Sequence, residues 1–414
     1  MRPPLRLFQA FGVEIEFMVV DRDTLDVRPV VDRLIHDIAG EYASEVELDG
    51  IALSNELTLH VAELKTNGPA PRLQGLAGRF QDQVRALDER LASLDARLMP
   101  GGMHPWMDPQ EMRLWPHDYN AVYEKFDDIF DCTGHGWANL QSTHINLPFR
   151  GNDELGRLHG AIRMVLPLIP ALAASSPILD GRAGPDLDNR LRAYQGNAHR
   201  VPSVAGLVIP EAVFTRRDYE EQILHRIYRD LEAYDPEGIL RYEWVNARGA
   251  IVRFDRSAIE IRLVDAQECP RADLAVAAAV VAAVRALALA DPPPGSTQAP
   301  ATETLAAILD STIARGEQAV IENDAFLGML GLSAPATAGD VWRYLVDTHV
   351  RADADAAEWI PALDVILEQG PLARRILRAV NAEPGTALER GRLRDVYRRL
   401  CDCLRDGTVL SVQD

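Results

Sequence analysis

The chain has 414 residues, 47% of them hydrophobic, which is enough to bury a large core in one main unit with an appended region. It carries 43 Lys and Arg against 62 Asp and Glu, and the resulting net charge of −19 disfavours attraction to nucleic acid and to anionic membranes. We therefore expect neither nucleic acid nor a membrane among its partners.

The predicted location is the cytoplasm. The opening residues, MRPPLRLFQAFG, hold no apolar run long enough for a signal peptide, and the longest apolar run, 274–284, is too short to cross a bilayer. The four cysteines have no CxxC spacing and no pattern typical of a disulfide framework, so we expect them to be reduced. They are Cys132, Cys269, Cys401 and Cys403.

Two strands are predicted near the beginning of the chain, over residues 7–20 and 53–65, because apolar and polar residues alternate in both. Each carries two acids, Glu14 and Glu16 in the first and Glu56 and Glu63 in the second. The first pair is two positions apart, so both side chains point to the same face. The second pair is seven apart, which puts its members on opposite faces unless a bulge or bend intervenes, and the sequence leaves this open.

Helix and strand patterns alternate in the middle of the chain. Leucines and alanines at helical spacing predict an amphipathic helix over 71–98, and residues 155–174 predict a second, apolar helix. Between them, alternation predicts a strand over 137–149. One face of that strand carries Ser142, His144 and Asn146. Residues 175–200 hold too many Gly, Pro and Asp residues for continuous regular structure, so we predict a polar loop, a kind of segment that often carries binding groups.

Strand patterns return at 242–264, and the segment RGAIVRFDRSAIEIR there supplies four charged candidates. These are Arg248, Arg253, Glu260 and Arg262. An Ala/Val-rich helix at 272–290 is most simply a core helix, and residues 291–304, DPPPGSTQAPATET, have the composition of a linker or exposed loop. The predicted organisation is a catalytic sheet domain over 1–290, that linker, and a helical region over 305–414 packed on the catalytic domain.

The acids on these strands raise a problem of charge. Valine, isoleucine and phenylalanine alternate with them, so the strands are at least half buried, and an unpaired buried carboxylate is strongly disfavoured. A cation is therefore expected opposite them. Mg²⁺ and Mn²⁺ prefer hard oxygen ligands, and carboxylates around an ion that bridges nucleotide phosphates are a common arrangement. The arginines suit phosphate, because the guanidinium is planar, permanently charged and donates two parallel hydrogen bonds.

Each candidate also has a simpler explanation. A Glu-x-Glu pair is common on a solvent-facing edge strand, and a single histidine such as His144 is more often structural than a metal ligand. Glu260 and Arg262 are two positions apart on one face, where an exposed ion pair is the simpler alternative. The sequence contains no P-loop, no Rossmann glycine motif and no nucleophile elbow, so phosphates would have to be held by side chains and metal ions.

Four ordered motifs together resemble glutamate-cysteine ligase family 2, the ATP-dependent carboxylate-amine ligases of the glutamine synthetase superfamily, over nearly the whole chain. GVEIEF resembles the family's opening Gly-Val-Glu-x-Glu-Phe strand, and AELKTN its second acidic strand. ASSPILDGR resembles its Ser-Ser-Pro loop, and RFDRSAIEIRLVDAQ its late strand pair. Many relatives carry His-Val-His where this chain has His144, Ile145 and Asn146, so acceptor specificity could differ.

The resemblance implies an α+β fold, in which a curved antiparallel sheet forms a funnel like that of glutamine synthetase, with flanking helices and a helical C-terminal region. It implies ATP and an amino acid at opposite ends, with Mg²⁺, or Mn²⁺ as an alternative, between them. The implied metal ligands are Glu14, His144 and Glu260 near the phosphates, and Glu16, Glu56 and Glu63 near the substrate carboxylate. Arg248, Arg253 and Arg262 would bind phosphate, and Arg253, Glu260 and Arg262 would be catalytic. In the polar loop, the candidates for amino acid recognition are Arg182, Asn189, Arg190 and Tyr194.

The implied reaction is a two-step ligation. The γ-carboxylate of glutamate, or of a related acid, attacks the γ-phosphate of ATP, and an amine such as cysteine then displaces phosphate from the acyl phosphate. Two alternatives are a guanidino kinase of the same superfamily and a catalytically silent relative that binds nucleotide or amino acid. The sequence does not identify the amine acceptor; a homodimer is compatible with it, but the oligomeric state is not fixed.

Overall fold

An antiparallel sheet of eight strands forms the centre of the structure, a computed structural model that describes residues 5–291, 293 and 300–412. The strand order is β2-β3-β4-β1-β6-β10-β9, and β5 pairs with the far end of β1. The strands are β1 (Gly12–Asp21), β2 (Glu45–Leu48), β3 (Ile51–Asn55), β4 (Val61–Thr66), β5 (Ala96–Met99), β6 (Ser142–Pro148), β9 (Ala250–Arg253) and β10 (Ala258–Asp265).

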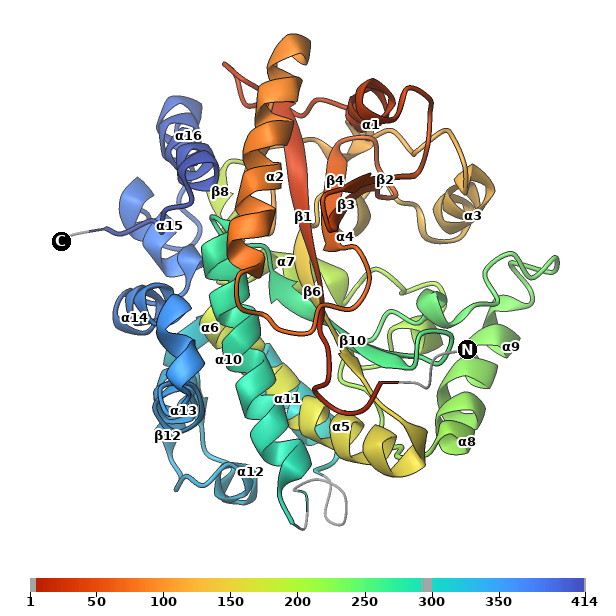
Figure 1. Cartoon of the computed structure of the whole chain (residues 1–414), viewed down its shortest axis with the longest axis vertical. Helices are drawn as coiled ribbons and strands as arrows, with labels where there is room; N and C mark the ends of the chain where they lie inside the picture. Colours follow the sequence, from red (N-terminus) through yellow and green to blue (C-terminus); the bar gives the residue numbers. More distant parts are fainter. Residues whose placement is uncertain (1–4, 292, 294–299, 413–414) are drawn as a thin grey trace.

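One face of this sheet is apolar and packs on helices. Val13, Ile15 and Phe17 of β1 are fully buried in the same core as α2 (Leu76–Leu91), α5 (Gly151–Val165) and α10 (Pro270–Leu289). In Figure 1, α2 runs alongside β1, α10 lies below α2, and α5 lies beside the lower end of α10. Because side chains alternate along a strand, packing of the odd-numbered residues sends the even-numbered acids to the opposite face.

The remaining helices of the first 290 residues are shorter. They are α1 (Val31–Ala39), α3 (Asn120–Phe130), α4 (His135–Ala138), α6 (Ile169–Ala173), α7 (Asn189–Tyr194), α8 (Arg216–Tyr219) and α9 (His225–Leu231). Helix α7 and a small hairpin, β7 (Ile178–Leu179) with β8 (Arg182–Ala183), lie inside the segment predicted to be a polar loop.

Helix α10 corrects one argument from the sequence. It is 20 residues long and has a mean hydropathy of 2.0, so by length and composition it could span a membrane. The inference that the apolar run in this segment is too short to cross a bilayer was therefore wrong. However, 78% of its most apolar window is buried inside the protein, where it packs on α2 and α5. Such burial is typical of a core helix.

Residues 300–412 form six helices and a small hairpin among the described residues. They are α11 (Thr302–Arg315), α12 (Asp324–Met329), α13 (Ala338–Leu345), α14 (Ile360–Gln369), α15 (Leu372–Val380) and α16 (Arg390–Asp406), with β11 (Val320–Ile321) and β12 (Ala336–Thr337). Most of them are drawn in blue along the left side of Figure 1. Trp342 donates a 2.7 Å hydrogen bond to the Leu168 carbonyl, and Arg375 forms a fully buried ion pair with Glu268, so these helices are tied to the rest of the chain.

The α+β prediction, with a large antiparallel sheet, flanking helices and a helical C-terminal region, is confirmed. Helix α11 begins at Thr302, within the predicted linker 291–304, and residues 292 and 294–299 of that linker lie outside the described residues. The division into a catalytic domain over 1–290 and an appended region stays a prediction.

Two predicted elements have different bounds for physical reasons. The predicted helix 71–98 ends earlier, because Asp95 adopts a left-handed backbone (φ 52°) and the next residues pair with β1 as β5. The predicted strand 53–65 is two strands, β3 and β4, which pair antiparallel with each other. The chain turns between them, and Glu56 lies in that turn.

Candidate active site

The polar face of the sheet lines a cavity of about 790 Å³. Helices α3, α4 and α7 and the segment before β9 complete its walls. It contains ten of the residues predicted from the sequence: Glu14, Glu16, Glu56, Glu63, His144, Arg190, Tyr194, Arg253, Glu260 and Arg262. Residues that are far apart along the chain therefore meet in one place.

Strand register explains this convergence. Glu14 on the central strand β1 is paired with His144 of β6 on one side and with Lys65 of β4 on the other. Side chains opposite each other on one face of a sheet are about 5 Å apart at Cβ, so these groups interact directly. A Cβ atom at Gly12 would lie 2.9 Å from the Cβ of its partner Asn146, so the glycine of GVEIEF permits this close pairing.

The acids form two overlapping clusters in which one ligand atom of each residue lies within 4.8 Å of the others. The first cluster comprises Glu14, Glu63 and His144, and the second comprises Glu16, Glu56 and Glu63. The turn between β3 and β4 resolves the odd separation of Glu56 and Glu63, because Glu56 does not belong to the strand that carries Glu63. Glu63 belongs to both clusters.

The second cluster holds more negative charge than its neighbours neutralise. Burial, and then the charges of Glu63 and Glu16, raise the pKa of Glu56 well above its usual value. Burial and the charge of Glu14 raise the pKa of Glu63 to about 7. Among the described residues, the Glu56 carboxylate has no hydrogen-bond or ion-pair partner. An oxygen-rich group of ligands with excess negative charge fits a hard divalent cation such as Mg²⁺ or Mn²⁺.

In the first cluster, His144 and Glu14 stabilise each other's charged forms. Their closest atoms, His144 Nδ1 and Glu14 Oε2, are 3.2 Å apart. Burial alone would raise the pKa of Glu14, but His144, Lys65 and Arg256 outweigh burial and lower it to about 2. Burial opposes the charging of His144, yet Glu14, Glu16 and Glu260 raise its pKa to about 9. A cation bound here would displace the His144 proton, because imidazole coordinates a metal only in its neutral form.

Glu260 is bonded to arginines. The Arg262 Nε donates to Glu260 Oε1 at 2.6 Å, and the Arg253 Nη1 donates to Oε2 at 3.4 Å. Although burial alone would lower the pKa of Arg262, the charge of Glu260 raises it. Tyr194 also hydrogen-bonds Arg262. Glu260 thus anchors two arginines at the cavity, and it lies outside both carboxylate clusters, so its predicted role as a metal ligand stays a prediction.

Arg190 is held in the cavity wall by the Ser-Ser-Pro and Asp-Ala-Gln motifs. It forms a buried ion pair with Asp265, and its Nη2 donates to the Leu263 carbonyl at 2.9 Å. Asp265 in turn accepts hydrogen bonds at 2.8 Å from the Ser175 backbone N–H and from the Ser176 hydroxyl. Two motifs that the sequence suggested for chemistry therefore position one arginine side chain.

The structure does not bring Arg248 into the cavity lining, so its role in phosphate binding stays a prediction that the geometry does not favour. Its side chain is 1% exposed, and Nε and Nη2 each donate to the Glu211 carboxylate at 2.6 Å. Its Nη1 donates to the Ser203 carbonyl and to Asn246 Oδ1. Four of its five N–H donors are therefore engaged, and the buried side chain lies outside the cavity lining, so it is not placed to bind a phosphate there.

Arg182 and Asn189, predicted to recognise the amino acid, also lie outside the cavity lining. The exposed Arg182 side chain donates to the Gly385 carbonyl at 2.8 Å. Asn189 is buried, and its side-chain amide donates to the carbonyls of Ser176 and Asp186. Both side chains therefore hold loops together.

Sequence reasoning missed several residues of the cavity. Arg256, in the turn between β9 and β10, lines the cavity, and its nearest carboxylate oxygens, on Glu14 and Asp255, are each 4.0 Å away. It also missed six aromatic residues: Tyr119, Tyr123, Phe126, Trp137, Tyr242 and Trp244. The spacing of residues 119, 122, 123 and 126 at i, i+3, i+4 and i+7 was the available signal, because it places them on one face of a helix.

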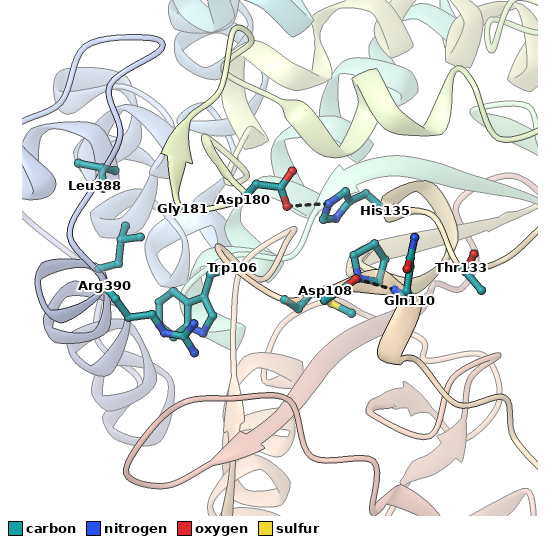
Figure 2. Close-up of a pocket in the computed structure, with 12 residues that line it drawn as sticks. Trp106, Asp108, Gln110, Thr133, His135, Asp180, Gly181, Leu388 and Arg390 are labelled. Carbon is teal, nitrogen blue, oxygen red and sulfur yellow. Dashed lines mark hydrogen bonds and ion pairs between the residues drawn. The ribbon is translucent and has the colours of Figure 1, made fainter.

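A second cavity of about 600 Å³ contains none of the predicted site residues. Figure 2 shows His135 beside Asp180, 3.0 Å apart, with Trp106 and Arg390 on another side of this cavity. The Arg390 guanidinium lies over the Trp106 ring, 4.7 Å from its centroid, which is within the roughly 6 Å typical of a cation–π pair. Helix α4 borders both cavities, since His135 lines this one and Trp137 lines the other.

Comparison with known proteins shows the family of this chain. The profile of glutamate-cysteine ligase family 2 matches residues 10–399. An uncharacterized protein of Archaeoglobus fulgidus is 36% identical over 276 residues, which is 66% of this chain and 74% of that protein. A Rubrobacter xylanophilus protein named "Putative glutamate--cysteine ligase 2-3" is 28% identical over 275 residues, covering 64% of this chain and 66% of its own length.

One solved structure shows the same fold. The crystal structure of glutamate–cysteine ligase from Francisella tularensis in complex with AMP matches with a TM-score of 0.62 at 11% identity, covering 97% of this chain and 90% of that chain. The structural match shows the fold, and the family match defines the protein as an ATP-dependent ligase that joins a carboxylate to an amine. The chain belongs to glutamate-cysteine ligase family 2.

Proposed function

We propose that the cavity on the polar face of the sheet catalyses formation of a γ-glutamyl amide, or of the amide of a related acid, at the expense of ATP. One observation carries the proposal. Two overlapping carboxylate clusters and three of the four arginines that line the cavity, Arg253, Arg256 and Arg262, meet in a space large enough for small substrates. Carboxylates that bind cations beside arginines that bind phosphate are the combination that phosphoryl transfer requires.

The reaction proceeds in two steps. A carboxylate oxygen of the acid attacks the γ-phosphorus of ATP, the bond to the β-phosphate oxygen breaks, and ADP leaves. The amine nitrogen then attacks the acyl carbon, forms the C–N bond and loses a proton, while inorganic phosphate leaves with the electron pair. Arg253 and Arg262, held in place by Glu260, stabilise the charge on the transferring phosphoryl group.

The metal ions fit the two clusters. Glu14, Glu63 and His144 would hold one ion, and Glu16, Glu56 and Glu63 would hold the other. These ligand sets differ from the predicted ones, because Glu63 belongs to both. Mg²⁺ or Mn²⁺ would lower the repulsion between the anionic acid and the nucleotide. The protein's own contribution is to orient these ligands and to keep the arginines charged beside them.

The experiment is a product analysis. The full chain is incubated with ATP, MgCl₂, glutamate labelled with ¹⁸O in its carboxylates, and a pool of amines, and products are identified by mass spectrometry. We expect ADP, a γ-glutamyl amide, and inorganic phosphate carrying one ¹⁸O atom, which reports the acyl phosphate. A phosphorylated guanidino compound without inorganic phosphate would indicate a guanidino kinase, and no ADP with any substrate would indicate a silent binding protein.

The family's namesake function favours glutamate as the acid, and the cavity lining supplies Arg190 and Tyr194 as candidates for holding it. A cytoplasmic location and a homodimeric assembly stay predictions from the sequence.

A further inference from the structure

An aromatic wall lines the cavity beside the carboxylates. We use this name for Tyr119, Tyr123, Phe126, Trp137, Tyr242 and Trp244, none of which belongs to the sheet. With Tyr194, seven of the 28 residues lining the cavity are aromatic, against 6% of the whole chain. This enrichment exceeds what ions, phosphates and a small polar acid need, because those ligands are recognised by charged and hydrogen-bonding groups.

Four rings of the aromatic wall are in contact with one another, and one of them is supported from behind. The Phe126 ring centroid is 5.5 Å from that of Trp137 and 5.9 Å from that of Trp244. Trp244 stacks on Tyr242 at 5.4 Å with an interplanar angle of 10°. The buried Phe130 stacks on Trp137 at 5.6 Å. These contacts position Phe126, Trp137, Tyr242 and Trp244 against one another, so this part of the apolar surface exists before any ligand binds.

The two ends of the aromatic wall have different neighbours. At one end, Tyr242 and Trp244 flank Glu243, whose carboxylate accepts a hydrogen bond from the Asp255 backbone N–H and lies 4.0 Å from Arg253 Nε. That end is therefore next to the phosphate-binding arginines. At the other end, the Tyr123 hydroxyl is 3.0 Å from Asn55 Nδ2, one residue before Glu56, so this end adjoins the second carboxylate cluster.

We propose that Tyr123, Phe126 and Trp137 receive the side chain of the amine acceptor, and that this acceptor carries an aromatic or bulky apolar group. The inference rests on the proposed ligase function. The flat base of ATP, which is linked through ribose to the phosphates, explains the end of the aromatic wall beside Arg253. The end beside Glu56 is left with an apolar surface that needs a second apolar partner, and the short polar side chain of cysteine would leave that surface in water.

The test uses matched amines with the full chain, ATP, MgCl₂ and glutamate. Phenethylamine is compared with ethylamine, and phenylalanine with alanine and cysteine, and ADP and amide are quantified. We expect kcat/KM to be on the order of 100-fold higher for each aromatic amine than for its small counterpart, since a single buried methylene already changes selectivity about tenfold or more. Equal or better turnover of cysteine or ethylamine overturns this inference and leaves the ligase function standing. No amide or ADP with any amine overturns the ligase function itself.

Variants distinguish the acceptor from the nucleotide base. Phe126→Ala and Trp137→Ala are expected to raise KM for the aromatic amine about tenfold while KM for ATP changes less than twofold. Tyr42→Ala is the control, because Tyr42 is an exposed aromatic residue, 53% accessible, outside the cavity. Phe126→Leu keeps an apolar side chain and is the conservative variant in case Phe126→Ala does not fold. Thermal unfolding of each variant tests whether it is folded. A rise in KM for ATP with no change for the amine would show that this end binds the base, and would overturn the proposal.

Discussion

Glu16 and Glu63 lie directly opposite each other across the pair β1 and β4, and they are only 8% and 5% exposed. Like charges directly opposite in a sheet are destabilising, and burial increases the effect. Nearby partners reduce it only in part: Ser142 donates two hydrogen bonds to Glu16, and Ser54 and Lys65 contact Glu63. A protein keeps such a pair when a cation uses it, and the second carboxylate cluster is built around it.

Glu63→Gln should therefore stabilise the metal-free protein and weaken metal binding. At pH 8 with EDTA we expect the free energy of unfolding to rise by on the order of 1 kcal/mol, because a charge opposite Glu16 is removed. Affinity for Mn²⁺ and the rate of ADP formation should fall at least about 100-fold, since Glu63 belongs to both clusters. Denaturant unfolding and calorimetric titration measure the two effects.

Glu45→Gln is the matched control for that variant. Glu45 is 49% exposed, contacts Lys65 at 2.8 Å and belongs to neither cluster. Its replacement should leave Mn²⁺ affinity and ADP formation nearly unchanged. Unaltered Mn²⁺ affinity in Glu63→Gln would remove the basis for metal binding at this site.

Arg256→Ala should weaken ATP binding with little effect on stability. The other cavity arginines have carboxylate partners within 3.4 Å, whereas Arg256 is 55% exposed and has none closer than 4.0 Å in the part of the chain that the structure describes. Its charge is therefore the least neutralised at the cavity, and we expect KM for ATP to rise about tenfold. Arg216→Ala serves as the control, since Arg216 stacks on Phe254 at 4.6 Å outside the cavity lining. A tenfold rise in that control would mean that net charge, and not position, is responsible.

The sequence predicted the polar face of the sheet well, because alternation alone decides which side chains share a face. Glu14, Glu16 and His144 needed only this rule and the pairing of neighbouring strands. Glu56 was ambiguous, because the turn between β3 and β4 interrupts what looked like one strand. Local spacing fixes faces within an element but does not locate the turns that end it.

The sequence did not allow contacts between distant segments to be predicted. Arg248 and Arg253 are both arginines on a strand-like segment, and only the fold shows that Glu211, 37 positions earlier, takes the first of them away from the cavity. The aromatic wall was missed for a similar reason. Its rings come from α3, α4 and the segment before β9. No pattern within any one of these segments predicts that the rings lie together.

Arg248→Met should distinguish a structural role of Arg248 from the predicted phosphate-binding role. Removing the guanidinium leaves Glu211 without its buried partner and the Ser203 carbonyl without this donor, so we expect a loss of about 3–5 kcal/mol in the free energy of unfolding. Arg262→Met is the comparison, because it lines the cavity and should abolish ADP formation with a smaller loss of stability. If Arg248→Met unfolds like the wild type and raises only KM for ATP, the phosphate role is restored.

Asp273→Asn should change how stability depends on pH. Asp273 is fully buried, one oxygen accepts from the Thr143 hydroxyl and the Gln267 backbone N–H, and the other has no partner in the described structure. Burial is the main cause that raises the pKa of Asp273 to about 7 from its ordinary 3.8. A carboxyl whose pKa is higher in the folded state contributes stability that is present below about pH 4 and lost as pH rises through 7.

The neutral asparagine cannot ionise, so this loss should disappear from the variant. Between pH 5 and pH 8, we expect the free energy of unfolding of the wild type to fall relative to that of Asp273→Asn by on the order of 2 kcal/mol. Urea unfolding at intervals of half a pH unit measures both profiles, and all other titrating groups cancel in their difference. Parallel profiles would mean that Asp273 stays ionised in the fold, in which case the Thr143 and Gln267 hydrogen bonds outweigh its burial.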